Sequence, residues 1–205
     1  MSIIEVYMAT IDWQTYLFPS SLQAPRTHLV EAHQLLGERL RGKVAVDCGC
    51  GHGRDTFYLL EQRYRVYAFD SNLESLRQLS THPLAASNPL LDLQHCSFSE
   101  YRFPKAHLVN ASASLFFCPR ADFYGVWQKI VQCVNPGGIF CGHFLGMNGD
   151  DSDFSDKIMT HSKPELERLF SQFYVVSWQQ RHEVSSQLTG EKRQWHIHTF
   201  IAMKK

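Results

Sequence analysis

The stretch VAVDCGCGHGRD, residues 44–55, decides the fold. It opens with apolar, largely β-branched residues, which favour a buried β-strand over residues 43–48. An acid stands near the end of this strand, at Asp47. Three glycines then follow at alternate positions: Gly49, Gly51 and Gly53. Because glycine adopts positive φ and exposes the backbone, the stretch predicts a strand that ends in a ligand-binding loop.

Strands and helices alternate along the rest of the chain. Further strands are predicted at residues 65–70, 90–96, 106–111, 139–146, 173–184 and 193–203. Helices are predicted at residues 26–40, 54–63, 72–79, 163–172 and 121–138, the last ended by its closing Asn-Pro-Gly-Gly. Such alternation is typical of an α/β fold: a doubly wound, seven-stranded, mainly parallel sheet with helices on both faces. The last two strands form a hairpin, so we expect the last strand to be antiparallel.

Composition and length indicate one globular domain. The chain has 205 residues, 44% of them hydrophobic and 20% charged, and its formal net charge is zero. We expect residues 1–24 to form an N-terminal lid or extension and residues 25–205 to form the domain. The neutral balance gives no sign of a nucleic-acid partner, and the absence of a long apolar run or signal peptide gives none of a membrane.

The six cysteines are scattered through apolar runs and show no disulfide framework, which predicts a reduced, cytoplasmic protein. Cys48 and Cys50 lack zinc spacing and a second ligand pair. His196 and His198 share one strand face but have no third ligand nearby. We therefore expect no metal.

The charge of the glycine loop indicates which ligand it binds. A dinucleotide loop reads G-x-G-x-x-G, whereas here the order is G-x-G-x-G with Asp47 just before it. A carboxylate there would repel a pyrophosphate and suits a cationic ligand. Asp70 ends the second strand, where an acid accepts hydrogen bonds from ribose hydroxyls. The two acids together describe an adenosine with a cationic tail, and S-adenosylmethionine fits that description.

These motifs resemble those of the class I S-adenosylmethionine-dependent methyltransferases. VAVDCGCGHGRD is similar to their first motif, VYAFD to their acidic second-strand end, and CVNPGGIF to the element before their fifth strand. PRTHLVEA, GHGRDTFYLL, PELERLF and the terminal IAMKK resemble the narrower tellurite-resistance methyltransferase family. The resemblance implies a Rossmann-like fold and methyl transfer to a small molecule. The acceptor would be a tellurium or selenium oxyanion or another soft nucleophile such as a thiol.

The resemblance also implies a set of cofactor-binding residues: Arg26, His28, Asp47, Gly49, Cys50, Gly51, Gly53, Arg54, Asp55, Asp70, Ser71, Asn72, Ser97, Phe98, Ala111 and Ser112. In it Asp47 binds the ammonium group, directly or through water, or holds the loop. Asp70 takes the ribose hydroxyls. Ser97 stands where the family often has an acid for the adenine amino group.

The family's basic substrate residues lie on the final hairpin, where the candidates are Arg181, His182, Lys192 and Arg193. The sequence identifies no catalytic base, and methyl transfer to a soft nucleophile needs none. Two other functions stay open: methylation of an oxygen or nitrogen metabolite, and non-catalytic binding of S-adenosylmethionine. In each the partner is a small molecule, with no nucleic acid or membrane, and the protein is a monomer or homodimer.

Overall fold

The computed structural model describes residues 24–37, 42–147, 158–186 and 192–205. The predicted N-terminal lid, apart from Ala24, lies outside the described residues. Eight strands form one sheet: β1 (Val44–Cys48), β2 (Arg65–Asp70), β3 (Leu91–His95), β4 (Ala106–Ala111), β5 (Val134–Gly146), β6 (Thr160–His161), β7 (Phe173–Ser186) and β8 (Lys192–Lys204). The helices are α3 (Thr27–Leu36), α4 (Arg54–Glu61), α5 (Leu73–Thr81), α6 (Arg120–Cys133) and α7 (Lys163–Leu169), with short 3-10 turns η1 (Leu115–Phe117) and η3 (Phe170–Gln172).

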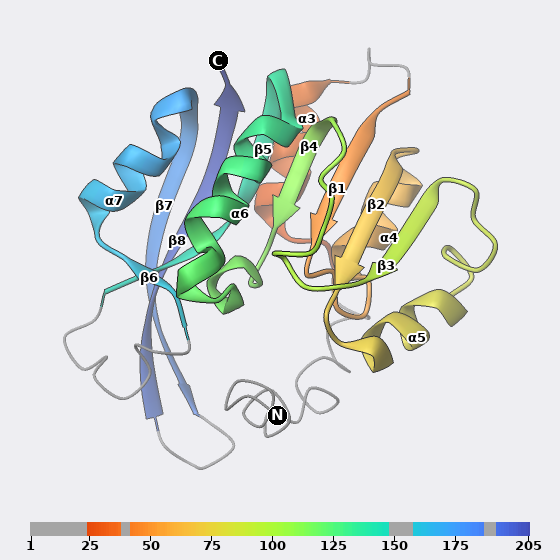
Figure 1. Cartoon of the computed structure of the whole chain (residues 1–205), viewed down its shortest axis with the longest axis horizontal. Coiled ribbons are helices and arrows are strands. Elements are labelled where there is room, and N and C mark those ends of the chain that lie inside the picture. The colour runs from red at the N-terminus through yellow and green to blue at the C-terminus, as the bar shows by residue number, and fades with distance from the viewer. Residues whose placement is uncertain (1–23, 38–41, 148–157, 187–191) are drawn as a thin grey trace.

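The strand order is β3-β2-β1-β4-β5-β8-β7, and β6 pairs with β5 (Figure 1). Strand β8 runs antiparallel to both of its neighbours, and the pairings among β1 to β6 are parallel. This confirms the α/β fold and the antiparallel last strand. The eighth strand was not predicted because β6 has only two residues and so carries no periodic signal.

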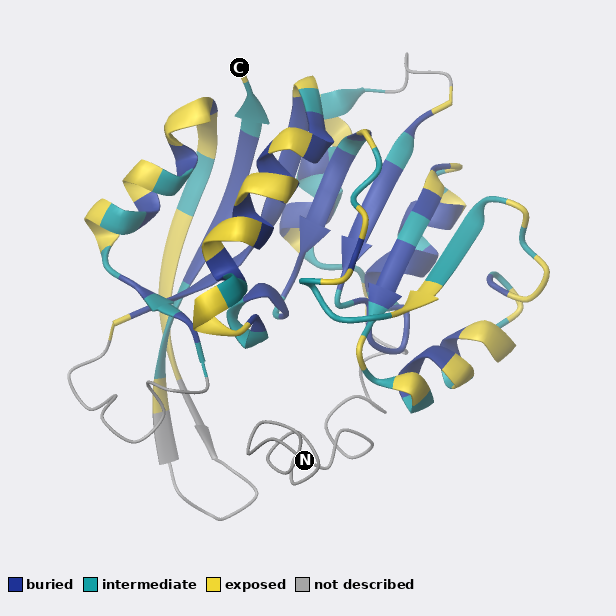
Figure 2. Ribbon diagram, viewed as in Figure 1, coloured by how far each residue is buried: buried dark blue, intermediate teal, exposed yellow. Residues whose placement is uncertain are grey.

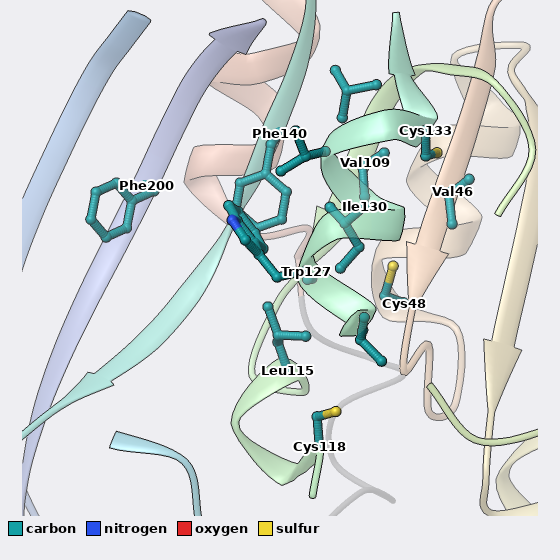
Figure 3. Packing of buried hydrophobic residues seen from close by; sticks show 14 of the residues in the cluster. Val46, Cys48, Val109, Leu115, Cys118, Trp127, Ile130, Cys133, Phe140 and Phe200 are labelled. Atoms are coloured by element: carbon teal, nitrogen blue, oxygen red, sulfur yellow. The ribbon is translucent and has the colours of Figure 1, made fainter. Parts of the chain in front are cut away.

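Helices cover both faces of the sheet, with α6 and α7 in front and α3 and α4 behind in the view of Figure 1. Figure 2 shows the buried strands between these two layers. On the α6 face the core centres on Trp127, whose ring lies 5.1 Å from that of Phe140 and 5.5 Å from that of Phe144 (Figure 3). Phe123, Ile130 and Trp127 are all buried, as their helical spacing predicts.

Strand β5 begins earlier than expected. Helix α6 ends at Cys133, just before the Asn-Pro-Gly-Gly sequence, as expected. Strand β5, however, already begins at Val134. Within this stretch Gly137 has a φ of +75°, and the pairing with β4 shifts register between Ala106 and Leu108. The irregular start of β5 therefore replaces the expected separate turn.

The topology fixes where a ligand can bind. From β1 the chain moves outward to β2 and β3, and β4 then returns to the other side of β1. In open α/β sheets, ligands bind beyond the carboxyl ends of the strands at such a reversal. The carboxyl ends of β1, β2 and β4 therefore define the candidate site. None of the described helices combines the length and apolar character that a membrane span requires.

Candidate functional site

The glycine loop between β1 and α4 is packed tightly against the rest of the protein. Gly49 has a φ of +66°, and a Cβ atom placed there would lie 2.4 Å from the Cβ of Ser114, just after β4. Gly53 has a φ of +90°, and its Cβ would lie 2.7 Å from the Phe57 ring and 2.9 Å from Cγ of Leu79. Two of the three motif glycines therefore make room for protein neighbours.

The third glycine is joined to the end of β2. The Gly51 N–H donates to Oδ2 of Asp70 over 2.8 Å, and the Asn72 N–H donates to Oδ1 over the same distance. The Cys50 N–H donates to the carbonyl of Phe69, which fixes the loop further. Burial raises the pKa of Asp70, and the hydrogen bonds from Asn72 and Gly51 oppose that rise. Each Asp70 oxygen keeps a further lone pair, so the carboxylate can still accept hydrogen bonds from a ligand.

Asp47, at the end of β1, is enclosed by protein. Its Oδ2 accepts from the Thr56 hydroxyl over 2.6 Å, and its Oδ1 accepts from the Asn110 amide over 2.8 Å. The residue is 2% exposed. Burial, and next the charge of Asp55, raise the pKa of Asp47 to about 7. In this arrangement Asp47 ties the start of α4 to the end of β4.

Asp55 joins the segment before α3 to the loop. Its carboxylate accepts from the backbone N–H of Arg26 over 3.1 Å and from the Arg26 guanidinium over 3.0 Å. It also accepts from the Asn110 amide over 3.2 Å. The neighbouring Arg54 donates to the carbonyl of Ala24 over 2.7 Å. The structure thus brings Arg26, Arg54 and Asp55 together beside the glycine loop.

His28 extends this network from α3 to the end of β4. Because the Asn110 amide nitrogen donates to two carboxylates, its oxygen must accept, and it accepts from the Ser112 hydroxyl over 2.6 Å. The Ser112 oxygen lies 2.7 Å from His28 Nε2 and has already donated its proton, so Nε2 carries a proton and Nδ1 a lone pair. Burial lowers the pKa of His28 to about 4, which keeps the ring neutral near pH 7.

His143, on β5, completes this cluster and was not among the predicted site residues. The Ala113 N–H donates to His143 Nδ1 over 3.1 Å, and the His143 and His28 rings meet edge to face with centroids 4.6 Å apart. Ala113 adopts a φ of +53°, which is unusual for a residue with a side chain. His143 Nε2 is buried and has no hydrogen-bond partner in the described structure.

The predicted adenine contacts lie at the far edge of the sheet, after β3. The Ser97 N–H and hydroxyl both donate to Oε2 of Glu100, over 2.9 and 2.7 Å. The Phe98 ring packs edge to face on Phe69, at 5.2 Å between centroids. Ser71, next to Asp70, accepts through its carbonyl from His95 Nε2 over 3.0 Å. Ser97 and Phe98 thus have partners within the protein, and a ligand there would have to compete with or pack beside them.

Of the candidate substrate residues on the final hairpin whose side chains the structure describes, Arg181 is the one whose charge acts on the rest of the site. Arg181 on β7 forms an ion pair with Glu183 over 2.6 Å, yet its charge also lowers the pKa of His28 and of His143. The His182 ring stacks on that of His196, with centroids 4.3 Å apart, away from these contacts. Lys192 and Arg193 lie in β8, but their side chains are outside the described residues.

Sequence reasoning missed Thr56, Asn110, Ser114 and His143. Asn110 and His143 did carry a signal, because each is a polar residue inside an apolar run assigned to a buried strand. Thr56 gave no such signal, since it sits at an ordinary position of an amphipathic helix. Ala111 is fully buried, and its carbonyl approaches Gly142 so closely that a Cβ on that glycine would lie 2.5 Å from the oxygen.

The chain is similar to known methyltransferases in part of its sequence and in its fold. Residues 45–138 match a family described as a methyltransferase domain. TehB from Haemophilus influenzae is similar in structure, with a TM-score of 0.77 and 16% identity, over 94% of this chain and 66% of that one. The chain thus spans about two thirds of the length of that structure.

Two further solved structures resemble the whole chain. One is a 1,6-didemethyltoxoflavin-N1-methyltransferase from Burkholderia thailandensis, with a TM-score of 0.67 and 21% identity over 100% of this chain and 92% of that one. The other is magnesium protoporphyrin IX methyltransferase from Synechocystis, with a TM-score of 0.66 and 10% identity over 100% and 98% of the two chains. No curated protein sequence matches the chain.

Proposed function

We propose, because this chain carries a methyltransferase domain and has the fold of the class I S-adenosylmethionine-dependent enzymes, that it methylates a small molecule through a soft nucleophilic atom. The favoured acceptors are tellurium or selenium oxyanions and thiols. TehB, a tellurite-resistance methyltransferase, has the highest TM-score of the three structures compared above, which supports this choice. The motifs around Arg26 and Asp55 support it as well, since they resemble that family.

The observation that carries the proposal is the hydrogen bond by which Asp70 holds the glycine loop. The carboxylate holds Gly51 with one oxygen and Asn72 with the other, at the point where the strand order reverses. Its remaining lone pairs suit the two hydroxyls of a ribose. Asp47 and Asp55 flank the same loop in the sequence and both accept hydrogen bonds from the Asn110 amide, so they hold the loop in place. These residues fit S-adenosylmethionine.

The cofactor supplies a methyl group on a sulfonium, which a nucleophile displaces in line while the C–S electron pair passes to sulfur. The protein's part is to orient the two reactants and exclude water, which is worth roughly 7–11 kcal/mol in well-oriented reactions. Asp70 and the loop hold one reactant. We place the other reactant next to His28, on α3, and Ser112, just after β4, which are hydrogen-bonded to each other. A soft anion needs no proton removed, so this arrangement needs no base.

A second acceptor class is favoured by one observation. His28 is neutral and has its Nδ1 lone pair free of the Ser112 bond, so it can accept a proton from an oxygen or nitrogen acceptor. Methylation of an oxygen or nitrogen metabolite is therefore the alternative. Non-catalytic binding of S-adenosylmethionine is a third reading, and activity measurements decide among the three.

The test combines binding with turnover. Calorimetry should show S-adenosylmethionine binding to the full chain, and labelled S-adenosylmethionine should then be offered with tellurite, selenite, thiols, phenols and amines. Methylated chalcogen or methylated thiol supports the proposal. Turnover of phenols or amines alone supports the alternative, and binding without any turnover supports the non-catalytic reading. Failure to bind S-adenosylmethionine would refute all three.

The surroundings of the protein are part of the proposal. All six cysteines are free thiols, five of them buried, which supports a reducing compartment, and we propose the cytoplasm. The partner is a small molecule, and no nucleic acid or membrane is needed for the reaction. A monomer or a homodimer would serve equally, because every residue invoked above comes from one chain.

A further inference from the structure

His143 has a buried nitrogen that the fold does not satisfy. The residue is 4% exposed, and its Nε2 makes no hydrogen bond in the described structure. Buried polar groups in folded proteins are almost always paired, because an unpaired donor loses its hydration without compensation. A buried polar atom without a hydrogen-bond partner beside a candidate site indicates that an atom of a ligand pairs with it.

The structure determines that this nitrogen is a donor. The Ala113 N–H donates to Nδ1 over 3.1 Å, so Nδ1 uses its lone pair and the neutral ring carries its proton on Nε2. Burial, and next the charge of His28, lower the pKa of His143 to about 2, so the ring stays neutral under ordinary conditions. A ligand at Nε2 must therefore supply an acceptor atom.

The surroundings indicate the charge of that atom. The guanidinium groups of Arg26, Arg54 and Arg181 all lie near enough to lower the pKa of both His143 and His28. Asp55 opposes them at His28. Arg26 is paired with Asp55 and Arg181 with Glu183, so among the described residues the guanidinium of Arg54 is the one of the three without an ion-pair partner. Its excess positive charge favours an anionic acceptor atom.

We propose that His143 binds the methyl acceptor, its Nε2–H donating to an anionic oxygen or chalcogen atom beside the nucleophilic one. This inference rests on the proposed function, which places the acceptor beside His28 and Ser112, and the His143 ring lies against that of His28. His143 is then a specificity-determining residue: it selects anionic acceptors over neutral ones of similar size. Ala113 positions it by fixing the tautomer through a strained backbone conformation.

A comparison within the chain shows why His143 and not another histidine carries the inference. Both ring nitrogens of His161 also lack partners. However, its ring lies against those of Phe123 and Phe144, at 4.7 and 5.5 Å, inside the aromatic core of the α6 face. The charges that act on His161, those of Glu165 and Arg120, are opposite in sign, so they do not favour an anion there.

The test uses two matched substitutions of His143. Asparagine keeps an acceptor near the Nδ1 position for the Ala113 N–H and removes the distal donor. Glutamine keeps a donor near the Nε2 position and removes that acceptor. Selenite is titrated calorimetrically into the full chain saturated with S-adenosylhomocysteine, with dimethyl sulfoxide as a neutral probe. The dissociation constant of S-adenosylhomocysteine is measured separately for each variant.

We expect wild type to bind selenite at least tenfold more tightly than dimethyl sulfoxide. H143N should weaken selenite binding about 10- to 100-fold, as for loss of a hydrogen bond to a charged group, and H143Q should stay within about threefold of wild type. Neither variant should change the affinity for S-adenosylhomocysteine.

Equal selenite affinity in H143N and wild type would overturn the inference. So would an equal loss in both variants, since that would mean a structural role, or wild-type binding of selenite no tighter than of dimethyl sulfoxide. Because S-adenosylhomocysteine binding is read on its own, its absence would refute the proposed function and would not be confused with these results.

Discussion

Replacing Gly49 by alanine tests whether the glycine loop is shaped by its protein neighbours. The new Cβ would lie 2.4 Å from the Cβ of Ser114, at a φ of +66°. Gly42 provides a matched control. Its φ is +68°, and no atom lies within 4 Å of the position that its Cβ would take. The two substitutions share a positive φ and differ in the steric contact.

The structure sets the size of each effect. An alanine in the left-handed region costs about 1–2 kcal/mol, and this is the whole expectation for G42A. Forcing extra volume into a packed site costs about 1–3 kcal/mol more, so G49A should lower the free energy of unfolding by about 2–5 kcal/mol. The contact partner is itself fixed, because the Ser114 hydroxyl donates to the carbonyl of Cys48 over 2.6 Å and cannot move away freely.

Urea denaturation of both variants and of wild type measures the difference directly. Adding Ser114→Gly to G49A should recover about 1–3 kcal/mol relative to the sum of the single changes, since it removes the atom that the alanine meets. If G49A is no more destabilising than G42A, or if the double variant shows no recovery, the packing argument is wrong and the glycine serves another purpose.

Three other predictions follow from the same network. Asp70→Ala should weaken S-adenosylmethionine binding by about 1.5–3 kcal/mol in calorimetry, and an unchanged affinity would remove Asp70 from the site. Asn110→Leu should lower the free energy of unfolding in urea by about 3 kcal/mol or more, because Asp47 and Asp55 each lose a buried donor; a loss below 1 kcal/mol would contradict the network. His161→Phe should remove a pH dependence of stability. Burial lowers the pKa of His161 from an ordinary 6.5 to about 4, so the unfolded chain takes up a proton at a higher pH than the folded protein does. Wild type therefore loses stability as the pH falls from about 6.5 to about 4. The variant should gain about 2 kcal/mol relative to wild type on going from pH 7.5 to pH 5, measured by urea denaturation at each pH, and parallel curves would refute this.

The fold was largely predictable because its strands and helices have strong, local signals. β1 and β2 are short apolar runs ending in acids, and α6 repeats buried residues every third or fourth position. The start of β5 was misplaced because its pairing with β4 overrides the turn signal of Asn-Pro-Gly-Gly. Two-residue β6 has no pattern of its own and exists only through its pairing with β5.

The sequence indicated where a candidate site lies but not how its residues are connected. The sequence indicated Asp47, Asp70 and the glycines, since each follows directly from a strand end. It did not indicate that Asn110 lies between two carboxylates or that His143 meets His28, because these contacts join residues tens of positions apart. Hydrogen-bond partners of this kind depend on strand order, and strand order is a property of the assembled sheet.

The packing around Gly49 and Gly53 changes what the glycine motif can tell about a relative of this protein. Ser114, Phe57 and Leu79 occupy the space next to those two positions. A descendant that had lost its activity would still need both glycines in order to fold. Asp70 is not required by a packing contact of this kind, so its loss would be an earlier sign that such a relative had lost its enzymatic activity.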